Sequence, residues 1–452
     1  MGIYSFAPNI LPILNLSLQR SAGKALVLHV DATKDSKTHS GFAEIVSLLM
    51  QHKARFREVS LRWDHTFPWN ANHFLEQGPI FPLLKRVRLN CRNSTAPYWF
   101  WEGIRCAPVL EAVTLSSLTT AARDILANSQ IRLLEIEDLA IFKKGFYDFR
   151  EFLSTLHRIE TMRICDCRHT QSLGAPFMRP LKNESLRTLA LKDIEPPYHF
   201  LSSLELPSLE TLVLMEEEPV EMPPRRIVSD LFATLQQFPS LHRLSFHFHL
   251  TQYHDSTQLV KLLHCLPNLT TLEVRVKAVD ESSFRKKCPT EGSDSCTLNL
   301  LFTLASTPSL GRKLKTLYLQ GSTENHFLDA GLLYRVVEAL EMRVALSKES
   351  LDGGVEPVAQ LTDLRISDYA WGGRKLVKTQ IAYLNKKLEQ LEVEGTTCAI
   401  VVGQTRSCSL GNKSLVLDLP PTQKEDSIGG FAPLVKHYTL IVRSSIPVFV
   451  VN

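Results

Sequence analysis

The chain has 452 residues, of which 44% are apolar and 22% are charged, a composition typical of soluble globular proteins. Its 51 basic and 47 acidic residues give a formal charge of +4, so neither nucleic acid nor an anionic membrane is expected as the main partner. Nine scattered cysteines are too few for a disulfide framework, which favours reduced thiols in the cytoplasm or nucleus.

Residues 1–24 are expected to form an N-terminal linker or cap. Residues 1–19 carry no charge, but a signal peptide would need a basic start, and Pro8 and Pro12 interrupt the apolar run. No uninterrupted apolar stretch of about 20 residues occurs in the sequence, so no membrane span is predicted.

Residues 25–395 are dominated by one repeated pattern. The phrase P-x-L-x-x-[LV]-x-[LFV] is more frequent than composition alone would produce, which indicates internal repetition. It occurs as PLLKRVRL (82–89), PVLEAVTL (108–115), PSLETLVL (207–214), PSLHRLSF (239–246) and PNLTTLEV (267–274).

Looser apolar triplets with L-x-x-L-x-L spacing extend this series. Most intervals between them lie between 21 and 32 residues, the period of leucine-rich repeats, and two longer intervals after Leu269 and Leu314 contain polar insertions. The triplets begin at Phe56, Leu84, Leu110, Ile131, Ile159, Leu186, Leu209, Leu241, Leu269, Leu314, Leu361 and Leu388.

The segments between triplets favour helices because apolar residues return at three- and four-residue steps. Examples are FAEIVSLLMQ, STQLVKLLHCL, LLYRVVEALEMRVAL and TQIAYLNKKLEQL. Strand, turn and helix in alternation predict an α/β fold, a leucine-rich-repeat solenoid of about twelve repeats, shaped as a right-handed horseshoe of parallel strands and helices. In each strand the second and third apolar positions should point inward, as Leu212 and Leu244 illustrate.

Tyr98, Trp99 and Trp101 form an aromatic cluster in the connection that precedes the triplet at Leu110. Packing of a helical layer against the sheet is the first interpretation of this cluster. Contact with a ligand is the alternative.

Sequence motifs for chemistry are weak. The chain contains no P-loop, nucleophile elbow or H-E-x-x-H motif. His247 and His249 would share one face of a strand and could hold a metal, but the inward alternation of Leu244, Phe246 and Phe248 explains them as outward polar positions. Accordingly we expect no enzyme activity, no cofactor and no metal.

The concave face of the sheet is the expected binding surface, because parallel strands display an array of outward side chains there. Two outward positions flank the last inward residue of each triplet, ending with Glu392 and Glu394. Exposed Met and Tyr among arginines match the residue types enriched in protein interfaces, although ordinary solvated strand positions would look similar. The candidate partner-binding residues are Arg88, Arg163, Met215, His247, Arg275 and Tyr318.

Residues 396–452 depart from the repeat. The phrases TTCAIVVG, SLVLDLPP and HYTLIVRSSIPVFVVN are β-branched and typical of strands. A β-rich C-terminal cap that covers the last repeat's core is the simplest role for them.

Together, the phrases FREVSL, FPLLKRVRL and APVLEAVTL resemble the leucine-rich-repeat region of F-box proteins of basidiomycete fungi. SLQRSAGKALVLHVDA (17–32) is similar to the segment that joins the F-box to the first repeat strand in that family, and the resemblance covers roughly residues 13–395. The F-box itself is not recognisable, although LPIL at 11–14 looks like a fragment of its opening.

This resemblance implies a non-catalytic substrate receptor of a cullin-type ubiquitin ligase. A protein substrate would lie on the concave face, and the ligase adaptor would bind only if an F-box lies upstream. A stand-alone leucine-rich-repeat scaffold with no link to ubiquitin is the alternative.

Overall fold

The computed structural model divides the chain into two compact units. Unit 1 contains residues 1–173, 181–186 and 428–452, and unit 2 contains residues 174–180 and 187–427. The structure describes residues 10–21, 23–32, 41–63, 81–91, 98–116, 130–137, 153, 155–167, 180–194, 197–215, 231, 233–249, 256–277, 303–307, 309–320, 327–328, 330–352, 358–371, 378–394, 396–403 and 438–443.

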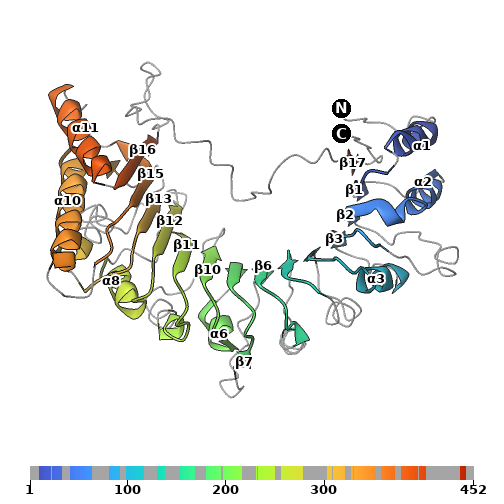
Figure 1. The fold of residues 1–452 in the computed structure, drawn as a ribbon, viewed down its shortest axis with the longest axis horizontal. Coiled ribbons are helices and arrows are strands. Elements are labelled where there is room, and N and C mark those ends of the chain that lie inside the picture. The colour runs from blue at the N-terminus through green and yellow to red at the C-terminus, as the bar shows by residue number, and fades with distance from the viewer. Residues whose placement is uncertain are drawn as a thin grey trace, which may run out of the picture. The chain divides into compact units, whose positions relative to one another are not determined.

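Unit 1 is a parallel sheet with helices on one side. Its strands pair in the order β17-β1-β2-β3-β4-β5-β6, and every pairing is parallel. Figure 1 shows α1, α2 and α3 on the same side of strands β1 to β3. The elements are α1 (Ile10–Arg20), β1 (Leu26–Ala32), α2 (Gly41–Met50), the 3-10 helix η2 (Lys53–Arg55), β2 (Phe56–Trp63), β3 (Arg86–Cys91), α3 (Tyr98–Arg105), β4 (Ala112–Leu115), β5 (Leu133–Ile136), β6 (Thr161–Cys167), β7 (Leu181–Lys182) and β17 (Tyr438–Arg443).

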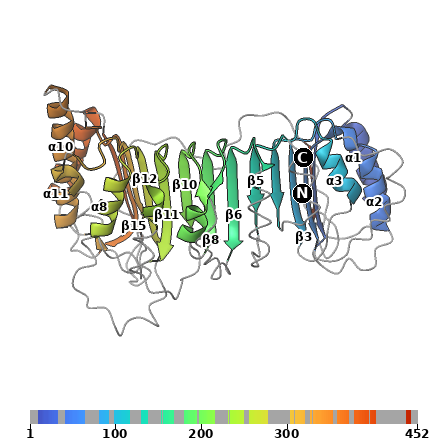
Figure 2. The ribbon, with the colours of Figure 1, turned by 90° about the horizontal axis from the view of Figure 1, so that it is seen from below.

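Unit 2 has the same α/β organisation. Its strands pair in parallel in the order β8-β10-β11-β12-β13-β15, and β14 and β16 each pair with β15. Figures 1 and 2 show α10 and α11 side by side next to β15. The elements are β8 (Thr188–Ile194), α6 (Pro197–Ser202), β9 (Leu204–Glu205), β10 (Thr211–Met215), β11 (Arg243–His249), α8 (Ser256–Cys265), β12 (Thr271–Lys277), β13 (Thr316–Gln320), β14 (Phe327–Leu328), α10 (Ala330–Asp352), β15 (Asp363–Trp371), α11 (Lys378–Val393) and β16 (Thr397–Gly403).

The proline of each repeated phrase is the second residue of a tight turn that leads into the strand. The leucine two residues later donates its backbone N–H to the carbonyl three residues back, as Leu209 does to Leu206 at 3.1 Å. Proline is favoured at the second position of such a turn, because its fixed φ fits and the N–H that it lacks is not needed. The same bond joins Leu84 to Phe81, Leu110 to Ala107, Leu241 to Phe238 and Leu269 to Leu266.

A shared backbone carbonyl then sets the register between neighbouring strands. The carbonyl oxygen of Lys85 accepts the N–H groups of Glu111 and Ala112, at 2.9 and 3.0 Å. The carbonyl oxygen of Glu210 in unit 2 accepts those of His242 and Arg243 in the same way. Because the accepting residue directly follows the triplet's first apolar residue, each triplet positions the next one along the sheet.

The apolar triplets form the core, as the sequence predicts. Leu212 and Leu244 are both 0% exposed, and their register partners in unit 2 continue the layer. Along β4, β5 and β10, buried residues alternate with half-buried ones, so the second face of the sheet carries the outward positions. The expectation of an α/β fold with a parallel, solenoid-like sheet is therefore confirmed.

The last triplet is an exception. Leu388 lies in α11, so the expectation of a strand there is wrong, and Glu392 and Glu394 do not belong to a strand either. L-x-x-L spacing also fits the 3.6-residue period of a helix. Leu384 and Leu391, which are seven residues apart and so share one face of α11, are both buried. The strand that follows β15 is β16, within the segment interpreted as the C-terminal cap.

A buried arginine joins α10 to the turn before β13. Arg343 is 4% exposed and donates to the carbonyl oxygens of Leu304 at 3.0 Å, Leu310 at 3.3 Å and Gly311 at 2.7 Å. Burial lowers the pKa of Arg343 to about 10, so the guanidinium keeps its proton at neutral pH. Gly311 has a φ of 54°, a conformation that favours glycine, which explains a Gly at this turn.

Two further expectations concern particular segments. Tyr98, Trp99 and Trp101 lie on α3, but their side chains are outside the described residues, so core packing and ligand contact both remain predictions. In the described part of the chain, no helix combines the length and the apolar character needed to cross a bilayer.

Candidate functional site

The polar face of unit 1 is the face of the sheet opposite the buried triplet residues. Strands β2 to β6 match residue for residue, so equivalent positions on successive strands stand side by side. The first row of this face consists of Ser60, Arg88, Thr114, Glu135 and Arg163. The second row, two residues further along each strand, consists of Arg62, Asn90, Ser116, Glu137 and Cys165.

Two of the candidate residues lie in the first row. Arg88 on β3 and Arg163 on β6 are both exposed. Their strands are separated by β4 and β5, whose first-row residues are Thr114 and Glu135. The sheet register therefore brings both arginines to one line on one face.

The other four candidates lie in unit 2. Met215, His247 and Arg275 are register partners on β10, β11 and β12, so their backbones form one row. Tyr318 on β13 belongs to the row beside it, next to Glu273. Met215 and Tyr318 are half-buried, whereas the side chains of His247 and Arg275 lie outside the described residues.

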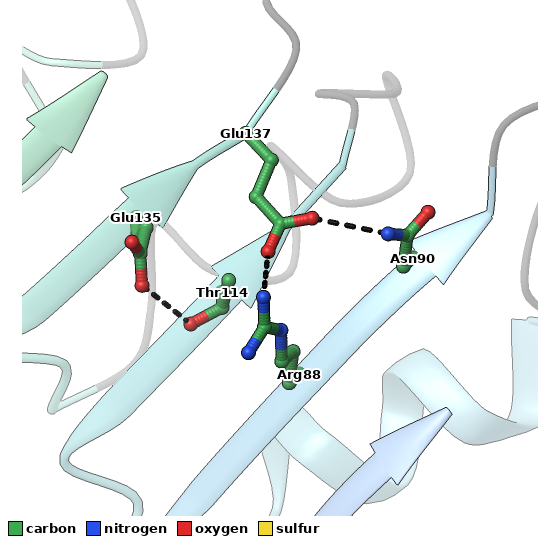
Figure 3. Close-up of polar contacts among 5 residues, drawn as sticks. All are labelled: Arg88, Asn90, Thr114, Glu135 and Glu137. Carbon is green, nitrogen blue, oxygen red and sulfur yellow. Dashed lines mark hydrogen bonds and ion pairs between the residues drawn. The ribbon is translucent and has the colours of Figure 1, made fainter. Parts of the chain in front are cut away.

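A carboxylate at the end of β5 links that strand to β3, across the strand between them (Figure 3). Glu137, which follows β5, accepts hydrogen bonds from two residues of β3: Arg88 through Nη2, and Asn90 through Nδ2 at 3.1 Å. The side chain of Glu137 thus reaches across β4. Small side chains there, among them Ser116 at 3% exposed, leave room for this crossing.

Next to this bridge, a hydroxyl orients a second carboxylate. Thr114 Oγ1 donates to Glu135 Oε2 at 3.2 Å (Figure 3). Arg163, the register partner of Glu135, has no ion-pair or hydrogen-bond partner within the part of the chain that the structure describes. Its exposed guanidinium is therefore available to another molecule.

The side-chain amide of Asn90 is only partly satisfied by hydrogen bonds to described residues. Its Oδ1 is buried and accepts no hydrogen bond from any described residue. The amide orientation is nevertheless consistent, because turning it over would place Oδ1 against the Glu137 carboxylate in place of the donating Nδ2. An unsatisfied acceptor costs free energy, so Asn90 is not optimised for the stability of the sheet alone.

On the corresponding face of unit 2, several of the described side chains are buried. Ser245 Oγ donates to Glu273 Oε2 at 2.9 Å, and the two residues are only 2% and 9% exposed. Ala190, on β8 in the same row, is also buried at 7%. Buried charges need partners, and Glu273 has at least this hydroxyl. These positions hold the strands together more than they present groups to solvent.

The chain matches no protein-family model, and no curated protein matches it. The interpretation of the face therefore depends on its own residues.

Its residues offer recognition chemistry. The described residues contain no group of three or more His, Cys, Asp and Glu side chains able to hold a metal ion. His247 and His249 both lie on β11, but their side chains are outside the described residues, so the structure does not test whether they hold a metal. Cys165 is a half-buried thiol in the second row. Charged and hydrogen-bonding groups in register are what the face has to offer.

Sequence reasoning identified Arg88 and Arg163 but missed the residues that surround them. Glu137 and Ser116 are also outward positions of their triplets, but the sequence pattern predicts neither the bridge that Glu137 forms nor the burial of Ser116. Glu137 and Arg88 are 49 residues apart, so only the alignment of repeats could have placed them together. The signal that could have revealed the bridge is the small size of the β4 residues between two charged strands.

Proposed function

We propose that the chain is a non-catalytic protein-binding receptor whose polar face holds a partner protein. In this proposal it is a leucine-rich-repeat horseshoe of about twelve repeats with a β-rich C-terminal cap, and it works in the cytoplasm or nucleus. The observation that carries the proposal is the sheet register of unit 1, which aligns Arg88, Thr114, Glu135 and Arg163 on one face.

The mixture of charges on this face favours protein over nucleic acid. A phosphate backbone is bound by surfaces of one sign, where lysines and arginines neutralise successive phosphates. Here Glu135 and Glu137 stand between Arg88 and Arg163, so a uniformly anionic ligand would meet two carboxylates. A protein surface that alternates in sign suits the face better, because complementary charges set register and exclude wrong partners.

The link to ubiquitin rests on the resemblance to fungal F-box proteins. In this proposal the chain is the substrate-recognition part of a cullin-type ligase, and the adaptor binds if an F-box lies upstream. A scaffold without any ubiquitin link is the second candidate. Adaptor binding is the property that separates the two.

Site-specific photo-cross-linking tests the binding face. A photoreactive residue in place of Ser60, in the first row, should cross-link the partner in cells that express the chain naturally. The same residue in place of Glu102, on α3 at the other side of the sheet, should not. Cross-linking of the same protein from both positions, or from Glu102 alone, would contradict the proposal.

A combined variant tests the candidate residues. Substituting Arg163→Glu, Met215→Ala and His247→Ala together should abolish capture of the cross-linked partner without lowering the melting temperature, since all three are outward positions of the repeat pattern. Arg105→Glu on α3 is the matched charge control. Retention of the partner by the triple variant would place the binding site elsewhere.

The ubiquitin link needs its own measurement. If the cullin-ligase adaptor co-purifies with the full-length protein and the partner is ubiquitylated, the receptor function holds. If the partner is captured but the adaptor is absent, the scaffold function replaces it.

A further inference from the structure

We propose that the first row of unit 1 binds an extended, alternating-charge segment of a partner, with acidic residues four positions apart and a basic residue midway between them. This inference rests on the proposed function and names the partner chemistry for the same face. It is carried by the register spacing of Arg88, Glu135 and Arg163, by the exposure of the two arginines, and by the contacts that Arg88 and Glu135 make.

The spacing of the two arginines is set by the sheet. Arg88 on β3 and Arg163 on β6 are three strand steps apart in one row. Because neighbouring strands lie about 4.8 Å apart, the two positions are about 14 Å apart. An extended chain advances about 3.3 Å per residue, so residues i and i+4 are about 13 Å apart and point to the same side. Carboxylates at i and i+4 therefore match the two guanidinium groups.

A helical ligand fits this spacing less well. A helix rises about 1.5 Å per residue, so it needs about nine residues to cover the distance. At about 100° per residue, side chains nine positions apart point to opposite sides of a helix. An extended ligand that crosses the strands is the conformation that presents both carboxylates to Arg88 and Arg163.

The two arginines are available to different degrees. Arg163 has no ion-pair or hydrogen-bond partner among the described residues, so a ligand carboxylate there displaces nothing. The Arg88 side chain is 60% exposed and is held on one side by Glu137, which leaves further N–H groups of the guanidinium pointing to solvent. The bridge to Glu137 also fixes the direction of Arg88, so less side-chain entropy is lost on binding.

The centre of the row favours a basic residue of the ligand. The residue at i+2 of the ligand lies about 7 Å from either end, between Thr114 and Glu135. Thr114 donates to one oxygen of Glu135, and no other described residue bonds to that carboxylate. A lysine or arginine at i+2 would pair with Glu135, whereas an acidic residue there would be repelled. The preferred pattern is acidic-x-basic-x-acidic, which reads the same in both chain directions.

A peptide array measures this preference directly. Labelled full-length protein is applied, at low ionic strength, to arrays of GEAKAEG, its charge-inverted form GKAEAKG, and GEAKEAG, in which the second acidic residue is one position too near. We expect GEAKAEG to retain about tenfold more protein than either of the other two peptides. Equal binding to the three peptides would overturn the inference.

Charge exchange on the protein assigns the contact. Arg163→Glu should abolish the preference for GEAKAEG and create a preference for GEAKAKG or GKAKAEG, because the pair is restored with inverted signs. Arg105→Glu on α3 changes the same charge on the other side of the sheet and should leave the preference as it is. An unchanged preference in Arg163→Glu would overturn the inference.

The failure of this inference differs from the failure of the proposed function. If the arrays show no preference while the photo-cross-linker at Ser60 still captures the partner, the face binds protein by another pattern. If the cross-linker at Ser60 captures nothing while the one at Glu102 does, the proposed function itself fails.

Discussion

The polar faces of the two units have the same backbone register but different consequences. In unit 1 the carboxylate of Glu137 lies 22% exposed and reaches across a strand to an arginine that is 60% exposed. In unit 2 the carboxylate of Glu273 lies 9% exposed beside Ser245 on the adjacent strand. A parallel solenoid-like sheet can therefore use its outward positions either to present charge or to bury it, depending on the size and polarity of neighbouring residues.

Core variants give the largest effect and test whether the two units depend on each other. Leu244→Asp places a carboxylate at a position of unit 2 that is 0% exposed, with Leu212 and Leu272 as its register partners. We expect a loss of unfolding free energy of about 4 kcal/mol, from the lost apolar burial and the buried charge. Thermal denaturation followed by circular dichroism measures it.

Arg243→Asp is the matched control, because Arg243 is the exposed neighbour on the same strand. Limited proteolysis of Leu244→Asp adds the comparison between units. If unit 2 is digested while unit 1 survives, the units are separately stable. A melting curve like that of the wild type would refute the assignment of Leu244 to the core.

The first eleven triplets show how far sequence reasoning reaches. The first apolar residue and the two inward positions are local features that recur in each of these triplets, and in five of them a proline leads into the triplet, as Pro207, Leu209 and Leu212 illustrate. Within each unit the sheet register follows from them, because the shared carbonyl joins successive triplets. Outward positions such as Arg88 and Arg163 could therefore be named before their surroundings were known.

Features that depend on a second element were not predictable in this way. Leu388 fits both a strand triplet and a helix, and the buried residues on its helix decide in favour of α11. Arg343 looks like a solvated residue of an amphipathic helix, but α10 lies over a turn whose carbonyls it bonds. The bridge from Glu137 to Arg88 joins two repeats across a third whose residues are small, so no single repeat predicts it.

Carboxylate removal gives an intermediate effect and tests whether the faces of the two units differ. Glu273→Ala leaves the Ser245 hydroxyl without this acceptor in a buried setting, so we expect it to lower the free energy of unfolding by about 2 kcal/mol. Glu137→Ala removes both the ion pair with Arg88 and the hydrogen bond from Asn90, and should lower it by about 1.5 kcal/mol. Chemical denaturation of the two variants measures both values.

Raised salt separates the two carboxylates further. Added salt should reduce the ion-pair part of the Glu137→Ala effect, because salt screens exposed charges, and should leave the effect of Glu273→Ala nearly unchanged. Equal salt dependence in the two variants would mean that the faces do not differ as their exposures indicate.

The smallest expected effect concerns Asn90, where two opposing terms nearly cancel. Asn90→Leu removes the hydrogen bond from Nδ2 to Glu137, which is worth about 1 kcal/mol, and also removes the buried Oδ1 that has no partner among the described residues, which relieves a penalty of similar size. We therefore expect the free energy of unfolding to change by less than about 0.5 kcal/mol, in contrast to Asn90→Asp, which places a second carboxylate beside Glu137 and should destabilise. Binding separates the two terms, because Glu137 without Asn90 holds Arg88 less firmly and a ligand at the first row would then lose affinity although stability is kept. A stability loss in Asn90→Leu as large as that of Asn90→Asp would show that the Oδ1 atom makes a favourable contact after all, and that the unit 1 face is built for stability as much as that of unit 2.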